Sequence, residues 1–196
     1  MGRGIGAGLI LRDQLFGGDG EGAGEIGHVV VEADGAPCHC GRFGCLETIA
    51  AAPAVLRAAA IAGIGRERRG AAPAAGVGGG TITATDDTPT LDDLALAAEA
   101  GDERAQTITR TAGRALGAAI AGLTGALDVR HVVVLGTMTR LGEPWFEAIR
   151  DEAARRSLGT LARETRIIDG GLGEDVTLLG ACALLLTHEL GLTVHR

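Results

Sequence analysis

Stretches with helical spacing of apolar residues alternate with short aliphatic runs in the second half of the chain. This pattern predicts helices separated by strands. The expected helices are Leu91–Ala100, Asp102 to about Leu127, Pro144 to about Arg156, and Val176–Leu190. The expected strands are His131–Leu135, buried because its aliphatic run is continuous, and Arg166–Asp169.

The first sixty residues show shorter elements and many glycines. The sequence predicts a strand over Gly4–Leu11, a turn at Arg12-Asp13, a returning strand over Gln14–Phe16, a loop over Gly17–Gly24, a strand over Val29–Val31 and a helix over Leu46–Ile61. An early hairpin followed by alternating helices and strands indicates an α/β fold.

The segment Gly63–Thr90 loses this periodicity and is rich in Ala, Pro, Gly and Thr. We expect it to be a flexible surface excursion within a single domain that spans residues 1–196. Thr90, followed by Asp93 three residues later, resembles a helix N-cap. No internal repeat or interdomain linker is evident.

Composition narrows the function classes. The chain is 46% hydrophobic but only 2% aromatic, so its core is expected to consist of small aliphatic side chains. The formal charge of −7 argues against nucleic-acid binding by this chain alone. No apolar run reaches the ~18 residues of a membrane helix, and no signal peptide is recognised. A soluble cytoplasmic protein is therefore expected.

Three of the four cysteines lie close together, in the run Cys38-His39-Cys40-Gly41-Arg42-Phe43-Gly44-Cys45-Leu46-Glu47, ten residues after His28. Zinc favours four tetrahedral ligands, and three thiolates with one imidazole meet that requirement. We expect the ligands to be His28, Cys38, Cys40 and Cys45. Four protein ligands would make this zinc structural. His39 is the alternative imidazole, and free thiols are the alternative to any metal. Cys182, in an apolar segment, is expected to be buried.

Glu25-Ile26-Gly27-His28 and the Cys-x-Cys-Gly-x-x-Gly-Cys-x-Glu run resemble the signature of the ROK family (repressor, open reading frame, kinase). The resemblance implies an actin-like, ribonuclease-H-like fold, of which this chain would be the C-terminal lobe. It also implies a ligand that is a hexose or an N-acetylated hexosamine, contacted by Glu25, His28 and Glu47. The zinc would orient His28, whose second ring nitrogen would face the sugar.

The same resemblance implies an ATP-binding side, but its glycine motifs are incomplete in this chain. Gly4 and Gly136 match glycines near the ATP phosphates, but Arg3 stands where kinases have a small hydroxyl residue, and Gly136-Thr137-Met138 keeps only one glycine. These departures weaken any ATP and Mg²⁺ site. In the family, the catalytic aspartate and first phosphate loop lie upstream of the segment that matches Gly4, so no catalytic residue is assigned.

Three functions remain after this comparison. The preferred one is the sugar-sensing domain of a ROK transcriptional repressor. The alternatives are part of an ATP-dependent kinase for glucose or an N-acetylhexosamine, and a remnant whose zinc only stabilises the fold. A homo-oligomer is expected in each case. The apolar segment Leu178–Leu186 is expected either to pack differently or to remain as an exposed apolar patch, and to cause self-association or poor solubility of the isolated chain.

Overall fold

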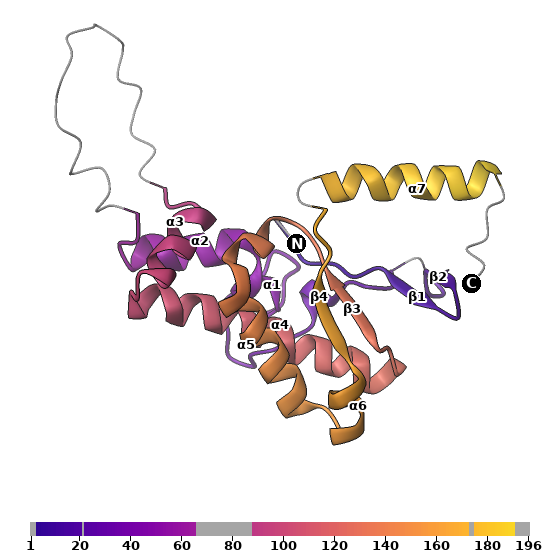
Figure 1. Ribbon diagram of the computed structural model, residues 1–196, viewed down its shortest axis with the longest axis horizontal. Helices are drawn as coiled ribbons and strands as arrows, with labels where there is room; N and C mark the ends of the chain where they lie inside the picture. The colour runs from indigo at the N-terminus through magenta and orange to yellow at the C-terminus, as the bar shows by residue number, and fades with distance from the viewer. Residues whose placement is uncertain (1–2, 21, 66–87, 173–174, 191–196) are drawn as a thin grey trace, which may run out of the picture.

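The computed structural model describes residues 3–20, 22–65, 88–172 and 175–190, and Figure 1 shows the arrangement of their elements. In chain order these are β1 (Leu9–Leu11), β2 (Gln14–Phe16), η1 (Ile26–His28), α1 (Glu47–Ala50), α2 (Ala52–Ile61), α3 (Leu91–Glu99), α4 (Glu103–Leu127), β3 (His131–Val134), η3 (Thr137–Leu141), α5 (Gly142–Arg156), α6 (Gly159–Glu164), β4 (Arg166–Asp169) and α7 (Val176–Leu190). The four long helices α3, α4, α5 and α7 begin and end close to where the sequence predicts.

Helices α4 and α5 form the centre of the core (Figure 1). Two glycines of α4 allow their backbones to approach closely. A Cβ on Gly113 would lie 2.8 Å from the Ala148 Cβ atom, and one on Gly117 would overlap the carbonyl oxygen of Ile149. Because these positions have no side chain, the fully buried Trp145 and Ile149 of α5 can pack directly against α4.

Capping residues fix where the middle helices start. Thr90 and Asp93 form a capping box at α3, with the Asp93 N–H donating to Thr90 Oγ1 at 3.1 Å and the Thr90 N–H donating to Asp93 Oδ2 at 3.0 Å. Asp102 caps α4 by accepting from the N–H groups of Arg104 and Ala105. The N-cap predicted at Thr90 is therefore confirmed.

The helix predicted over Leu46–Ile61 is instead two helices. Ala51 takes an extended conformation between α1 and α2. Pro53 explains the break, because a proline inside a continuous helix would clash with the carbonyl of Ile49 and could not donate to it. Pro53 fits the first turn of α2, where a missing N–H costs nothing.

β2 and β4 have the predicted bounds, whereas β1 and β3 are shorter than predicted and β3 is less buried. β1 and β2 form the expected antiparallel hairpin, with Arg12 and Asp13 at positive φ in its turn. Gly4–Gly8 precede β1 without strand pairing; instead the Ala7 N–H donates to Gly24 O before η1, and Ile5 O accepts from the N–H of Gly27 within η1. β3 pairs in parallel with β4, but Val133 is 50% exposed and only Val134 of β3 is buried.

The strand predicted over Val29–Val31 is wrong. The backbone there turns from η1 into hydrogen bonds with the cysteine segment, with Leu46 N–H donating to Val29 O and Val31 N–H donating to Gly44 O. Only one bridge, between Val30 and Cys45, has strand geometry. The valine run is therefore used to attach the cysteine segment to the core.

Helix α7 lies apart from α4 and α5 in Figure 1. Its leucines are exposed, including Leu178 at 67% and Leu185 at 61%, and Cys182 is also exposed, contrary to the expectation that it is buried. No helix in the described ranges is both long and apolar enough to cross a membrane. Most of the excursion expected over Gly63–Thr90 lies outside the described residues.

Candidate metal and ligand site

The four predicted metal ligands come from three neighbouring segments. His28 ends η1, Cys38 and Cys40 lie in a tight turn, and Cys45 directly precedes α1. We call residues 37–47 the cysteine knuckle. Its turn is closed by the Cys38 N–H donating to Arg42 O at 2.7 Å and the Gly41 N–H donating to Cys38 O at 3.0 Å. Gly41 and Gly44 have positive φ, which lets the chain reverse twice within five residues.

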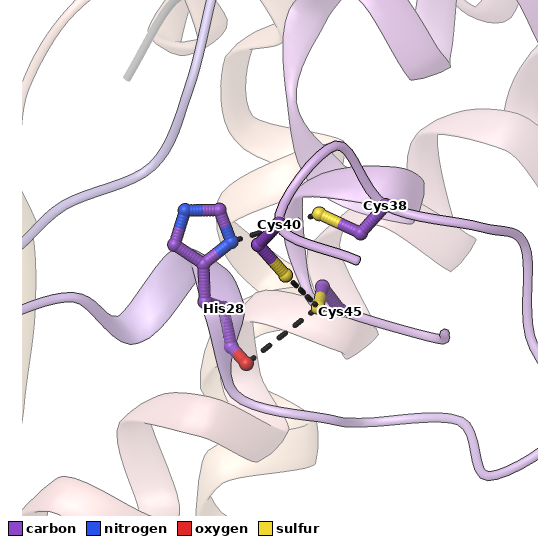
Figure 2. A group of neighbouring side chains, drawn as sticks. All are labelled: His28, Cys38, Cys40 and Cys45. Carbon is purple, nitrogen blue, oxygen red and sulfur yellow. Dashed lines mark hydrogen bonds between the residues drawn. The ribbon is translucent and has the colours of Figure 1, made fainter. Parts of the chain in front are cut away.

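The ligand atoms of His28, Cys38, Cys40 and Cys45 all lie within 4.8 Å of one another (Figure 2). His28 Nδ1 is 3.6 Å from Cys38 Sγ, and Cys40 Sγ is 3.6 Å from Cys45 Sγ. Usual zinc bond lengths give tetrahedral edges of about 3.6 Å between nitrogen and sulfur and about 3.8 Å between sulfurs. A disulfide needs a sulfur–sulfur distance of about 2.05 Å. The spacing therefore fits ligands around a metal ion.

The ionisation of the thiols supports the same interpretation. The backbone N–H of Arg42 lowers the pKa of Cys40, and burial raises the pKa of Cys45. The backbone at Cys40 favours the Cys38 thiolate, but burial and hydrogen bonds with the other thiols and Glu47 raise the pKa of Cys38 to about 12. Acidic groups packed this closely need a cation for all of them to ionise, and a divalent metal supplies it.

The two ring nitrogens of His28 face different surroundings. Its Nδ1 atom faces the sulfurs, whereas its Nε2 atom lies 4.0 Å from Glu25 Oε2. Glu47 lies on the metal side as well, with Oε1 at 3.7 Å from His28 Nδ1 and 3.4 Å from Cys38 Sγ. The structure thus gathers all three predicted sugar contacts around one partly exposed imidazole. Glu25 is well exposed, whereas the Glu47 side chain is only 10% exposed.

His39 lies next to Glu47. It is absent from the group of His28 and the three cysteines, but with His28 and Glu47 it forms a second group whose ligand atoms all lie within 4.8 Å of one another. Its Nδ1 atom lies 2.8 Å from Glu47 Oε1. Its ring also meets the His28 ring edge to face at 5.1 Å. His39 therefore holds the Glu47 carboxylate. Sequence spacing does not show this contact, because His39 and Glu47 meet only when the turn that carries His39 folds back onto the start of α1.

The two predicted nucleotide-side glycines lie in different surroundings. A Cβ on Gly4 would lie 3.3 Å from Glu47 Oε2, so Gly4 lies against the carboxylate predicted to contact sugar. Gly136 has a φ of 102° and begins η3, where its carbonyl accepts from the N–H of Thr139. Gly4 is thus adjacent to Glu47, and Gly136 marks the turn that follows β3.

A sequence model of the ROK family matches residues 1–188. The chain belongs to the ROK family. It is 30% identical over 190 residues to a glucokinase from Halalkalibacterium halodurans, an alignment that covers 96% of this chain and 55% of that protein. It is also 32% identical over 184 residues to the N-acetylglucosamine repressor from Shigella flexneri. That alignment covers 93% of this chain and 42% of the repressor.

Solved structures of this family have the same fold. The ROK glucokinase from Streptomyces griseus, in complex with glucose and AMPPNP, superimposes with a TM-score of 0.74 at 28% identity, over 94% of this chain and 58% of that one. The α/β, actin-like fold class predicted from the sequence is therefore confirmed. The chain spans about half the length of the ROK proteins it matches, and these include both sugar kinases and repressors.

Proposed function

We propose that this chain is the zinc-containing, sugar-binding domain of a ROK transcriptional repressor. The main support is the orientation of His28. Its Nδ1 atom faces three sulfurs, and its Nε2 atom is left on the side of Glu25. A zinc ion at Nδ1 would lock the tautomer with the proton on Nε2, which could then donate to a sugar hydroxyl.

The two carboxylates would complete the sugar contacts. Ionised Glu25 and Glu47 can each accept from adjacent hydroxyls, and such charge-assisted hydrogen bonds are short and strong. Glu47 pairs with His39, whereas Glu25 is exposed and its Oε2 atom lies 4.0 Å from His28 Nε2. The proposed ligand is a hexose or an N-acetylated hexosamine. The names of the relatives are compatible with both, since they include a glucokinase and an N-acetylglucosamine repressor.

The zinc would be structural, because four protein ligands leave no open coordination position. Elemental analysis of the purified chain should give one zinc per chain. Cys45→Ser should remove it, because Cys45 is fully buried within the ligand group. Cys182→Ser is the matched control and should retain zinc, since Cys182 lies in α7. Equal zinc content in both variants, or none in the unaltered chain, would refute the metal site.

A sugar kinase is the second candidate, favoured by the structural likeness to the glucokinase with bound glucose and AMPPNP. Two features support the repressor instead. Arg3 occupies the place of the hydroxyl residue expected in kinases, and only one glycine remains in Gly136-Thr137-Met138. Backbone amides need glycine there to approach phosphate closely. We propose no DNA contact for this chain itself, which carries a net charge of −7.

Calorimetry with a panel of hexoses and N-acetylhexosamines tests the sugar site directly. The chain should bind at least one of them, and Glu47→Gln should weaken binding about tenfold or more by removing a charged acceptor. A parallel assay should detect no transfer of phosphate from ATP to glucose. Binding supports the sugar site, and phosphate transfer would overturn the repressor proposal in favour of the kinase. If the chain neither binds a sugar nor transfers phosphate, only a structural role for the zinc is left.

A further inference from the structure

Glu47 is a largely buried carboxylate whose two oxygen atoms have different surroundings. Its side chain is only 10% exposed. Oε1 lies 2.8 Å from His39 Nδ1, 3.4 Å from Cys38 Sγ and 3.7 Å from His28 Nδ1. Oε2 lies on the side of Gly4, where a Cβ would approach it to 3.3 Å, and it has no hydrogen-bond partner among the described residues. The protein therefore contacts one oxygen of this carboxylate and leaves the other without a donor.

With the metal site filled, His39 is the side chain best placed to donate to Glu47 Oε1. A metal-bound Cys38 is a thiolate without a proton to give, and the lone pair of His28 Nδ1 would point to the metal. Neither group could then donate to the carboxylate. The neutral ring of His39 can carry its proton on Nδ1 and donate it to Oε1 across the 2.8 Å separation. Among the described side chains near Oε1, that leaves His39 to fix the direction of the carboxylate.

The backbone on both sides of His39 sets the place of its ring. The Cys38 N–H donates to Arg42 O at 2.7 Å, and the Gly41 N–H donates to Cys38 O at 3.0 Å, so His39 lies inside a closed turn. Its two neighbours, Cys38 and Cys40, both belong to the proposed ligand group. The His39 side chain is 75% exposed, so burial does not hold it in place. Its position depends mainly on the turn, which metal binding would fix from both sides.

We propose that His39 is a positioning residue for the sugar contact of Glu47. The metal-bound turn presents the His39 ring, the ring orients the carboxylate, and Glu47 Oε2 accepts from a hydroxyl of the hexose or N-acetylated hexosamine. The sugar site is thus linked to the metal site along two routes, directly through His28 and indirectly through His39 and Glu47. This inference rests on the proposed function, because the contact between Glu47 and a sugar is part of it.

Three variants of the full chain test this role by calorimetry, with the sugar of the hexose and N-acetylhexosamine panel that the unaltered chain binds most tightly. His39→Ala should weaken binding about tenfold or more, since it removes a hydrogen bond to a charged group. His39→Asn should restore most of the affinity, because the asparagine amide can donate from a place close to that of Nδ1. Phe43→Ala is the matched control. It removes a 59% exposed ring from the same knuckle and should leave the affinity unchanged.

Zinc content and a double substitution separate positioning from other roles. All three variants should keep one zinc per chain, because His39 lies outside the group of His28 and the three cysteines. In a Glu47→Ala background, His39→Ala should have little further effect on sugar affinity, since the carboxylate that it orients is gone. Circular dichroism checks that each variant is folded. If the double variant binds too weakly for calorimetry, the comparison of His39→Ala with His39→Asn decides.

Each other outcome overturns the inference in a recognisable way. If His39→Ala binds the sugar as tightly as the unaltered chain, or His39→Asn binds as weakly as His39→Ala, the positioning role is refuted and the sugar site stands. If His39→Ala loses zinc, His39 is a metal ligand. If its full effect persists in the Glu47→Ala background, His39 acts on the sugar without Glu47. If the unaltered chain binds no sugar of the panel, the proposed function itself fails.

Discussion

At the scale of single residues, the knuckle contains two glycines in a backbone conformation that other residues rarely adopt. Gly44 has a φ of 67°, and a Cβ there would overlap the carbonyl oxygen of Glu32. Gly41 has a φ of 86°, but a Cβ there meets no atom within 4 Å. The two glycines share the same unusual backbone conformation and differ in the space around them, so they form a matched pair for mutation.

Gly41→Ala should cost about 1–2 kcal/mol, the strain of a left-handed conformation with a side chain. Gly44→Ala should cost more than about 3 kcal/mol, since the backbone at Glu32 must also move. Thermal unfolding and zinc content measure both effects. Gly44→Ala is expected to lose zinc and Gly41→Ala to retain it. Similar behaviour of the two variants would show that the packing of Gly44 against Glu32 does not matter.

The charge of Glu152 gives a prediction about pH. This buried carboxylate of α5 lies 2.6 Å from the Arg155 guanidinium and 2.5 Å from that of Arg156. These hydrogen bonds lower its pKa from 4.5 to about 2. Because the folded pKa lies below the unfolded one, the stabilisation is complete above about pH 4.5 and is lost as pH falls towards 2.

Glu152→Gln should therefore lower the unfolding temperature at pH 7 by a few degrees. The unfolding temperature of this variant should also fall less steeply between pH 4.5 and 2 than that of the unaltered chain. Glu147→Gln is the control, because Glu147 is exposed on the same helix. If both variants show the same pH dependence as the unaltered chain, the cluster contributes nothing to stability.

At the scale of elements, the sequence predicts helices better than strands for physical reasons. Helix limits depend on local signals, such as the Thr90–Asp93 box and the proline at the start of α5. Strand pairing depends on distant partners. The valines after His28 look like a strand but bond to the knuckle, which only the folded chain brings beside them. The grouping of His28 with Cys38, Cys40 and Cys45 was predictable from spacing, whereas the contact between His39 and Glu47 was not.

Contact between α4 and α5 can be tested with glycines of the same helix. Gly117 lies against the α5 backbone, whereas Gly125 is exposed and a Cβ there meets nothing within 4 Å. Gly125→Ala should stabilise the chain by about 0.5–1 kcal/mol, since alanine is the better helix former. Gly117→Ala should destabilise it by about 1–3 kcal/mol through overpacking. Denaturant unfolding gives both values, and stabilisation by Gly117→Ala would contradict the close packing.

At the scale of the whole molecule, the exposed apolar surface is unusual. Helix α7 exposes six leucines, Leu178, Leu179, Leu184, Leu185, Leu186 and Leu190, and the hairpin β1–β2 exposes Ile10, Leu15 and Phe16. The hydrophobic core lies elsewhere, around α4 and α5, and contrary to the expectation of small aliphatic side chains alone it contains Trp145 and Phe146. Apolar patches of this kind on a folded chain favour association, because their burial removes water from the leucine side chains.

The isolated chain should therefore associate as its concentration rises, which sedimentation velocity can measure. Replacing Leu178 and Leu185 of α7 together by Gln should shift the association to concentrations about tenfold or more higher, because each exposed leucine that becomes buried contributes about 1.5–3 kcal/mol. Leu158→Gln is the matched control, since Leu158 is 73% exposed but lies before α6, away from α7. A chain that stays monomeric at high concentration would show that the leucines of α7 remain in water without a partner. An equal effect of Leu158→Gln would show that association depends on general hydrophobicity and not on α7.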